Sequence, residues 1–172
     1  MDSLVPFHDR RAPGRPDRRS APPSSATAMS GPLRIDPSLR PAVSKDPWVA
    51  MVSASLVDYA SGQTERAMAS WHDEITWEVR CAGTETAAIG PRAVLDYHAD
   101  LLARTDGTFR QHLVSLEASG GPVVAAHVRT TASRRERSLD IPSLLVFEVA
   151  HGRIRRVTEI HGDPVAWGAF WE

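Results

Sequence analysis

The spacing of apolar residues changes along the chain from a helical to a strand-like period, and this change outlines the fold. Asp46-Pro47 is typical of a helix start, and apolar residues then recur every three or four positions as far as Tyr59. We predict a helix from 46 to about 62 and a short second helix over 64–71. Over 74–80 the period becomes two, which predicts a half-buried strand.

The second half of the chain is mostly strand-like. We predict a loop over 81–89 and a helix over 90–107. Four strands follow, over 108–118, 122–133, 138–150 and 153–161, and a short helix over 163–171 ends the chain. Helices that come early and strands that come late favour an α+β domain. Its antiparallel strands would meander into a curved sheet with the helices on one face.

The last two predicted strands meet at His151-Gly152, and the second of them carries a carboxylate among apolar residues. Residues two apart on a strand share a face, so Val157, Glu159 and His161 point the same way. A two-residue turn places Glu159 opposite Leu144, and Glu148 opposite Arg155. If this face is concave, a carboxyl lies in an apolar cup. Burial raises the pKa of a carboxyl, which then works as an acid or base near neutrality.

The first 45 residues differ in composition from the rest. They hold eight of the thirteen prolines, and 8 Lys/Arg against 4 Asp/Glu, whereas the remaining 127 residues hold 12 against 17. Such a segment buries too little apolar surface to offset the entropy of ordering it. We predict a disordered tail over 1–45, with Met29 as an alternative start, and a domain over 46–172. Prolines and acids interrupt the arginines of the tail, so we do not expect nucleic-acid binding.

Several classes of protein are excluded by what the sequence lacks. The single cysteine, Cys81, excludes an internal disulfide and a multi-cysteine zinc site, and no histidine pair has the spacing of a helical metal site. No phosphate-binding loop, dinucleotide fingerprint or nucleophile elbow is present. No apolar run reaches the roughly 18 residues that span a membrane. We therefore expect a cytoplasmic protein without a metal or cofactor.

Four short motifs, in this order, carry a resemblance to a known family. They are Asp73-Glu74-Ile75-Thr76-Trp77 after Gly62; Ile89-Gly90-Pro91-Arg92-Ala93-Val94; Gly107-Thr108-Phe109-Arg110; and Val146-Phe147-Glu148-Val149 followed by Gly152-Arg153-Ile154. Over about 46–171 the chain resembles the SnoaL-like branch of the nuclear-transport-factor-2-like superfamily, which includes ketosteroid isomerase, polyketide cyclases and limonene epoxide hydrolase. The resemblance implies a cone-shaped α+β fold. In this fold a curved antiparallel sheet encloses a pocket together with three helices, which precede most of the strands in the sequence. A short helix ends the chain. The open face of the sheet forms a homodimer.

The chemistry of similar proteins transfers only in part. Epoxide hydrolases of this fold hold a water with a Tyr-x-Asn pair on the first strand, an Arg-x-Asp pair on a middle strand and an Asp on the last. The corresponding positions here are Trp77 and Val79, Arg129 and Thr131, and Glu159. Only the arginine and the last carboxylate match, so we do not expect standard epoxide hydrolysis.

The comparison with ketosteroid isomerase fails, because its general base and its oxyanion tyrosine would fall near Val79 and Ser55. The similar polyketide cyclases use one acid/base carboxylate in an apolar cup, and Glu159 matches that role. The hypothesis is therefore a cofactor-independent enzyme that acts on a hydrophobic small molecule as an isomerase, cyclase, dehydratase or epoxide-opening enzyme. The alternative is a non-catalytic ligand-binding or dimerisation module.

The candidate residues fall into two groups. The catalytic group is Glu159, Arg129, His127 and His161, with Arg129 orienting Glu159 or holding a substrate oxygen. The substrate-binding group is Trp77, Val79, Tyr97, Tyr59, His112, Thr131 and Val157. Each also has a plainer interpretation: Glu159 as a rim residue paired with an arginine, Arg129 as an outward side chain, the histidines as partly buried structural residues, and the aromatic residues as core.

Overall fold

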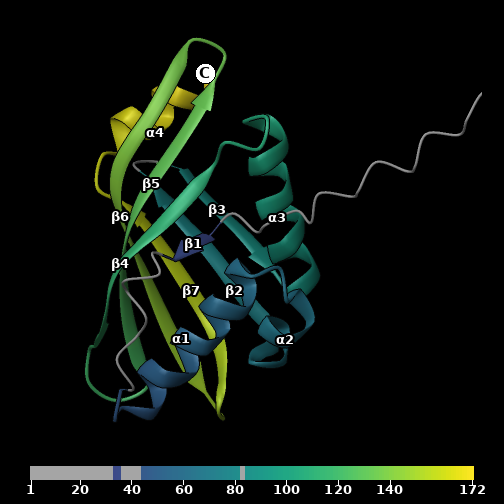
Figure 1. The fold of residues 1–172 in the computed structure, drawn as a ribbon, viewed down its shortest axis with the longest axis vertical. Coiled ribbons are helices and arrows are strands. Elements are labelled where there is room, and N and C mark those ends of the chain that lie inside the picture. Colours follow the sequence, from purple (N-terminus) through teal and green to yellow (C-terminus); the bar gives the residue numbers. More distant parts are fainter. Residues whose placement is uncertain (1–32, 36–43, 82–83) are drawn as a thin grey trace, which may run out of the picture.

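The fold is one curved seven-stranded sheet with helices packed against it (Figure 1), in a computed structural model that describes residues 33–35, 44–81 and 84–172. The strands are β1 (Leu33–Ile35), β2 (Trp71–Cys81), β3 (Thr84–Ile89), β4 (Arg110–Ala118), β5 (Val123–Arg134), β6 (Arg137–Ala150) and β7 (Arg153–His161). The helices are α1 (Pro47–Ala60), α2 (Thr64–Ala69), α3 (Pro91–Arg104) and α4 (Pro164–Trp171). The predicted α+β class is confirmed.

The strands run in the order β1-β4-β5-β6-β7-β2-β3. Neighbours from β4 to β7 are antiparallel, as the predicted meander requires. The pairs β1–β4 and β2–β7 are parallel, so the sheet is mixed rather than wholly antiparallel. Because β2 lies beside β7, the first long strand and the last are neighbours, and the residues of both reach the same part of the core.

The helices begin where the sequence predicts. The Asp46 carboxylate accepts hydrogen bonds from the backbone N–H groups of Trp48 and Val49 at 2.8 and 3.1 Å, with a proline at the first helical position. Asp163 caps α4 in the same way, through the N–H of Ala166 at 2.8 Å. Among the described helices, none is long and apolar enough to cross a membrane.

Two strands lie where none is predicted. Thr84–Ile89, within the predicted loop 81–89, forms β3 and pairs with β2 at one edge of the sheet. Leu33–Ile35, within the predicted disordered tail, forms β1, and Leu33 is only 2% exposed. Both segments are short edge strands without a clear alternation of apolar residues, so their pairing partners rather than their own pattern define them. The rest of the predicted tail up to residue 43 lies outside the described residues.

The register of the last hairpin differs from the prediction by one residue. The two-residue turn is present, with φ of 51° at His151 and 73° at Gly152, the left-handed values that such a hairpin turn needs. A bulge follows it, between Glu148 and Val149 on β6, where β7 carries one residue more. Glu148 is therefore opposite Arg156, not Arg155, and Glu159 is opposite Leu145, not Leu144. The predicted register is wrong, but Glu159 still shares the buried face with Val157 and His161.

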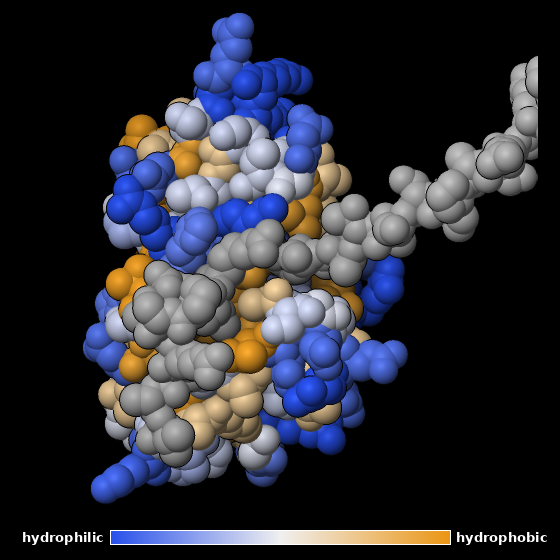
Figure 2. Space-filling model, viewed as in Figure 1, coloured by the Kyte–Doolittle hydropathy of each residue, from blue (hydrophilic) through white to orange (hydrophobic). Residues whose placement is uncertain are grey.

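The tip of the β5–β6 hairpin is charged and stands apart from the core (Figure 2). Arg135, Glu136 and Arg137 are exposed there. Two arginines of this hairpin turn back onto α4: Arg134 donates to the backbone oxygen of Trp171 at 2.7 Å, and Arg137 donates to the backbone oxygen of Ala169. The hairpin therefore supplies donors to carbonyl groups at the end of α4, which packs against β6.

The core consists of two apolar clusters on the helix-covered face of the sheet. The larger one surrounds Trp71, Trp77 and Phe147, and the smaller one surrounds Phe109 and Trp167 near α4. Polar side chains are also buried on this face: Gln111, Thr130, Ser143, Glu159 and His161 are each at most 6% exposed. They come from four adjacent strands, β4 to β7, and together form a polar row across the core.

Candidate functional site

The centre of the polar row is the carboxyl group of Glu159 on β7, which is fully buried. Its Oε2 accepts a hydrogen bond from the indole Nε1 of Trp77 at 3.0 Å, and its Oε1 accepts one from Nε2 of Gln111 at 2.6 Å. Trp77 comes from β2, on one side of β7, and Gln111 from the more distant β4. Two neutral donors therefore hold the carboxyl at a fixed position.

Burial raises the pKa of Glu159 from 4.5 to about 7, against the two hydrogen bonds, which lower it. Because neither Trp77 nor Gln111 carries a charge, they offset only part of the cost of ionising a carboxyl in the core. A group with a pKa of about 7 is present in both protonation states near neutral pH. It can therefore accept a proton and return it.

His161 lies next to this carboxyl on the same face of β7. Its Nε2 is 3.7 Å from Oε1 of Glu159, and its Nδ1 is 3.0 Å from the hydroxyl oxygen of Ser143. The imidazole stacks on Trp167 of α4, with 3.7 Å between ring centroids and 21° between planes. Burial lowers the pKa of His161 to about 4, so the ring is neutral at neutral pH. Glu159 and His161 are thus a carboxyl and a neutral imidazole rather than an ion pair.

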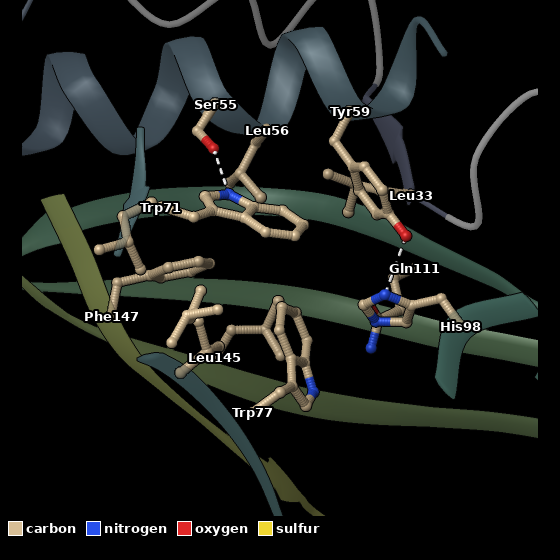
Figure 3. A pocket seen from close by; sticks show the side chains of 13 residues that line it. Leu33, Ser55, Leu56, Tyr59, Trp71, Trp77, His98, Gln111, Leu145 and Phe147 are labelled. Carbon is tan, nitrogen blue, oxygen red and sulfur yellow. Dashed lines mark hydrogen bonds between the residues drawn. The ribbon is translucent and has the colours of Figure 1, made fainter. Parts of the chain in front are cut away.

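A small cavity adjoins the site on the side of α1 (Figure 3). Its walls are mostly apolar, from Leu33 to Val157, and its polar groups are those of Tyr59, His98, Gln111 and Ser55. The cavity volume is about 20 Å³, which is room for about one water molecule. Glu159 does not line the cavity. Trp77 and Gln111 do line it, and both donate hydrogen bonds to the Glu159 carboxyl. The carboxyl therefore lies one side chain behind the cavity wall.

At the polar end of the cavity a tyrosine pairs with a buried histidine. The hydroxyl of Tyr59 is 2.8 Å from Nδ1 of His98, which is 2% exposed, and a dashed line marks this hydrogen bond in Figure 3. The rings of His98 and Trp77 meet in a T-shaped contact, with 4.6 Å between centroids and 84° between planes. Burial lowers the pKa of His98 to about 3, so this histidine also stays neutral.

Comparison with known proteins identifies this arrangement at the level of the family. Residues 52–157, more than half of the chain, match the SnoaL-like domain. The chain belongs to the SnoaL-like domain family. Relatives with detectable sequence identity include an uncharacterized protein of Mycobacterium tuberculosis and one of Mycobacterium bovis, each 38% identical over 73 residues. These residues make up 42% of this chain and 55% of each relative, so the match spans about half the length of those proteins.

Solved structures agree with this SnoaL-like fold. Bal32a, from a soil-derived mobile gene cassette, has 24% sequence identity and a TM-score of 0.65 over 73% of this chain and 96% of its own. TerC, co-crystallised with polyporic acid, has 15% identity and a TM-score of 0.61 over 73% and 98%. A candidate SnoaL-like polyketide cyclase from Jannaschia has 11% identity and a TM-score of 0.58 over 74% and 96%. At these identities the likeness shows the fold alone.

Several predicted residues of this SnoaL-like domain lie on its buried face. Trp77 contacts both the carboxyl and the cavity, and Tyr59 and Val157 line the cavity. Val79 is buried and pairs with Glu159 in register, but it does not line the cavity. Tyr97 likewise lies outside the cavity wall. It packs between the two core clusters, and burial and the charge of Glu159 both raise its pKa.

The predicted pairing of Arg129 with Glu159 is wrong. Arg129 lies on the opposite face of β5, with an exposed side chain, and its guanidinium donates to Asp140 of β6 through two hydrogen bonds of 2.5 and 2.7 Å. The face is set by the buried residues of β5, which are the even-numbered ones from Val124 to Ala132. An arginine at an odd position therefore points away from the core.

The outer face of the sheet, where Arg129 lies, also holds His127, Thr131 and His112. Their predicted roles at the pocket are therefore wrong as well. The side chain of His127 is 51% exposed and lies 3.9 Å from a carboxylate oxygen of Glu117. The hydroxyl of Thr131 is 3.3 Å from Nε2 of His112, at an exposed position. Because β5 and β4 are antiparallel, the outward residues of one strand face those of the other.

The buried polar residues that are absent from the predicted site include Gln111, Thr130, Ser143 and His98. The pattern of the sequence contains a signal for Gln111 and His98. Gln111 alternates with Phe109 and Leu113, both buried, and His98 follows Val94 by one helical turn. A polar residue at a core position of an otherwise apolar period indicates a buried partner, and here the partner of Gln111 is Glu159.

In the described part of the chain, no group of three or more His, Cys, Asp or Glu residues comes close enough together to hold a metal ion. Two buried histidines of the core pair with hydroxyl groups, His98 with Tyr59 and His161 with Ser143.

Proposed function

We propose that this SnoaL-like domain binds a hydrophobic small molecule and transfers a proton on it by general acid/base catalysis without a cofactor, with Glu159 as the proton-transfer group. One observation carries the proposal: a fully buried carboxyl with a pKa of about 7 is held by two neutral donors, and no arginine or lysine among the described side chains pairs with it. A structural carboxylate is normally paired with a cation, which keeps its pKa low. Glu159 is instead left in the range that proton transfer needs.

The surrounding groups suit this chemistry. Trp77 and Gln111 stabilise the ionised form through Nε1 and Nε2, so Glu159 acts first as a base and returns the proton as a neutral acid. His161 offers a second polar group at 3.7 Å that stays uncharged. Isomerisation, cyclisation, dehydration and epoxide opening share a proton transfer next to an oxygen. The proposal covers this class of reaction rather than one substrate.

Access to the carboxyl requires a movement of the cavity wall. The cavity of about 20 Å³ is far below the several hundred Å³ of a usual ligand pocket. A substrate reaches Glu159 only when Trp77 or Gln111 moves aside, because both lie between the carboxyl and the cavity. If the wall opens for a ligand while Trp77 and Gln111 stay on the carboxyl, the ligand is bound without turnover, which is the second candidate function.

The test uses a model ketone and a single-atom change in the carboxyl. The probe is 2-tetralone, whose acidic C–H protons next to the carbonyl exchange for deuterium when a base is near. We expect the wild-type protein to accelerate this exchange in D₂O, and Glu159→Gln to lower the protein-dependent rate by about 10²-fold or more. Proton NMR follows the loss of the C–H signals, and exposed Glu74→Gln is the matched control.

Three outcomes are informative. Loss of exchange in Glu159→Gln with full exchange in Glu74→Gln supports the proposal. Equal exchange in both variants contradicts it. Binding of 2-tetralone without exchange supports the ligand-binding function in place of the catalytic one.

We propose a homodimer through the outer face of the sheet, which carries side chains of mixed character. Ile160 on β7 is 40% exposed there, and the Arg129–Asp140 ion pair lies on the same face. A patch that combines apolar surface with charges of both signs suits contact with a second copy of itself. The oligomeric state in solution tests this part of the proposal.

A further inference from the structure

A chain of three buried hydroxyl and imidazole groups leads from β5 to the candidate site. The hydroxyl of Thr130 donates to the hydroxyl oxygen of Ser143 at 2.9 Å, and Ser143 is 3.0 Å from Nδ1 of His161. The three residues are 0%, 6% and 4% exposed, and they come from β5, β6 and β7. The chain is therefore closed to solvent.

The first hydrogen bond leaves the hydrogen of the Ser143 hydroxyl available for the second. A hydroxyl has one hydrogen to donate. Since the oxygen of Ser143 accepts from Thr130, its own hydrogen is available for Nδ1 of His161. A neutral imidazole carries one hydrogen, so when Nδ1 accepts, the hydrogen lies on Nε2.

The other side of the imidazole favours the same arrangement. Nε2 of His161 is fully buried and has no hydrogen-bond partner among the described residues, and Oε1 of Glu159 lies 3.7 Å away. An N–H at Nε2 faces a carboxylate oxygen favourably, whereas a lone pair would face it unfavourably. The stacked indole of Trp167 keeps the ring in this plane.

We propose that Ser143 and Thr130 are positioning residues that hold His161 as the tautomer with its hydrogen on Nε2, directed at Glu159. His161 is then a neutral donor beside the carboxyl. Its Nε2–H can donate a hydrogen bond to an oxygen atom of a substrate bound beside Glu159. This role of the donor in turnover rests on the proposed function, but the tautomer itself does not.

The experiment measures the tautomer directly. ¹⁵N NMR of histidine-labelled full-length protein distinguishes a protonated ring nitrogen from an unprotonated one. We expect a protonated Nε2 and an unprotonated Nδ1 at His161 in the wild-type protein. Ser143→Ala removes the donor to Nδ1, so the two ¹⁵N shifts are expected to move toward each other. Ser143→Thr keeps the hydroxyl and is expected to restore the wild-type shifts.

Two further variants separate positioning from a general loss of packing. Thr130→Val removes only the outer hydroxyl, and we expect a smaller movement in the same direction. Ser53→Ala removes a buried hydroxyl of α1 that is not part of the Thr130–Ser143–His161 hydrogen-bond series. The His161 shifts should stay unchanged in this variant. A protonated Nδ1 in the wild-type protein, or unchanged shifts in both Ser143→Ala and Thr130→Val, would overturn the proposal.

The exchange of 2-tetralone keeps this proposal distinct from the proposed function. We expect Ser143→Ala to lower the exchange rate about tenfold, the usual effect of losing one hydrogen bond. If Glu159→Gln abolishes exchange while the tautomer is the wrong one, only the positioning role fails. If the tautomer is correct while no exchange depends on Glu159, the proposed function fails and the positioning of His161 stands.

Discussion

Glu159→Gln is expected to become more stable relative to the wild-type protein as the pH rises from 5 to 8. The pKa of Glu159 is about 7 in the folded protein and 4.5 in an ordinary environment. Below pH 4.5 the carboxyl is protonated in both states and burial adds no ionisation cost. Above pH 7 it is ionised in both, and the folded state bears the full cost of about 3 kcal/mol. Glutamine is neutral throughout and bears none of it.

We expect the difference in free energy of unfolding between the variant and the wild type to shift by about 2–3 kcal/mol in favour of the variant between these pH values. Urea denaturation at pH 5 and pH 8 measures it. The pKa values of His98 and His161 are lowered, so both lose stability in acid, but this loss is common to the two proteins and cancels in the difference. Exposed Glu74→Gln should show no such shift. A constant difference between wild type and Glu159→Gln at the two pH values would contradict a raised pKa.

Gln111→Leu is expected to destabilise the protein by about 3 kcal/mol at pH 8 and by clearly less at pH 5. The change removes the 2.6 Å hydrogen bond to Oε1 of Glu159 and leaves that oxygen buried with one donor fewer. An ionised carboxylate depends on its donors far more than a neutral carboxyl does, so the cost grows as Glu159 ionises. Urea denaturation at both pH values is again the measurement.

A double-mutant cycle shows whether this effect acts through the carboxyl. In the Glu159→Gln background, Gln111→Leu should cost about the same at pH 5 and pH 8, because no ionised carboxylate remains. An additional cost at pH 8 that persists in this background would show that Gln111 stabilises the fold by another route.

The sequence predicts the framework of this SnoaL-like domain well because the framework depends on local chemistry. Asp46 and Asp163 cap the helices that follow them, and His151-Gly152 forms the turn of the last hairpin. The period of two around Glu159 places that residue on the buried face whatever the register of the hairpin. These features require no knowledge of distant residues.

The parts that could not be predicted depend on pairing between distant segments. The bulge beside Val149 shifts the register, and no turn residue marks it in the sequence. β1 is defined by its parallel pairing with β4. For Arg129, the two faces of β5 begin alike, with Val123 and Ala125 on one and Val124 and Ala126 on the other, so the strand alone does not show which face is buried.

The partners of Glu159 are also set by the sheet order rather than by the sequence. Trp77 and Gln111 are separated from Glu159 by 82 and 48 residues, and they reach it only because β2 lies beside β7 and the sheet curves β4 toward them. Charge complementarity in the sequence indicates Arg129 as the partner of Glu159, whereas the actual donors are neutral. Burial raises the pKa of Glu159, and these neutral donors lower it only in part.

The most direct test of the account is a ¹³C NMR titration of the Glu159 side-chain carboxyl in the wild-type protein, assigned by the loss of its signal in Glu159→Gln. The account predicts a midpoint near pH 7. A midpoint near 4.5, the ordinary value for glutamate, would mean that water or a cation reaches the carboxyl, and the basis for proton transfer at this position would be removed.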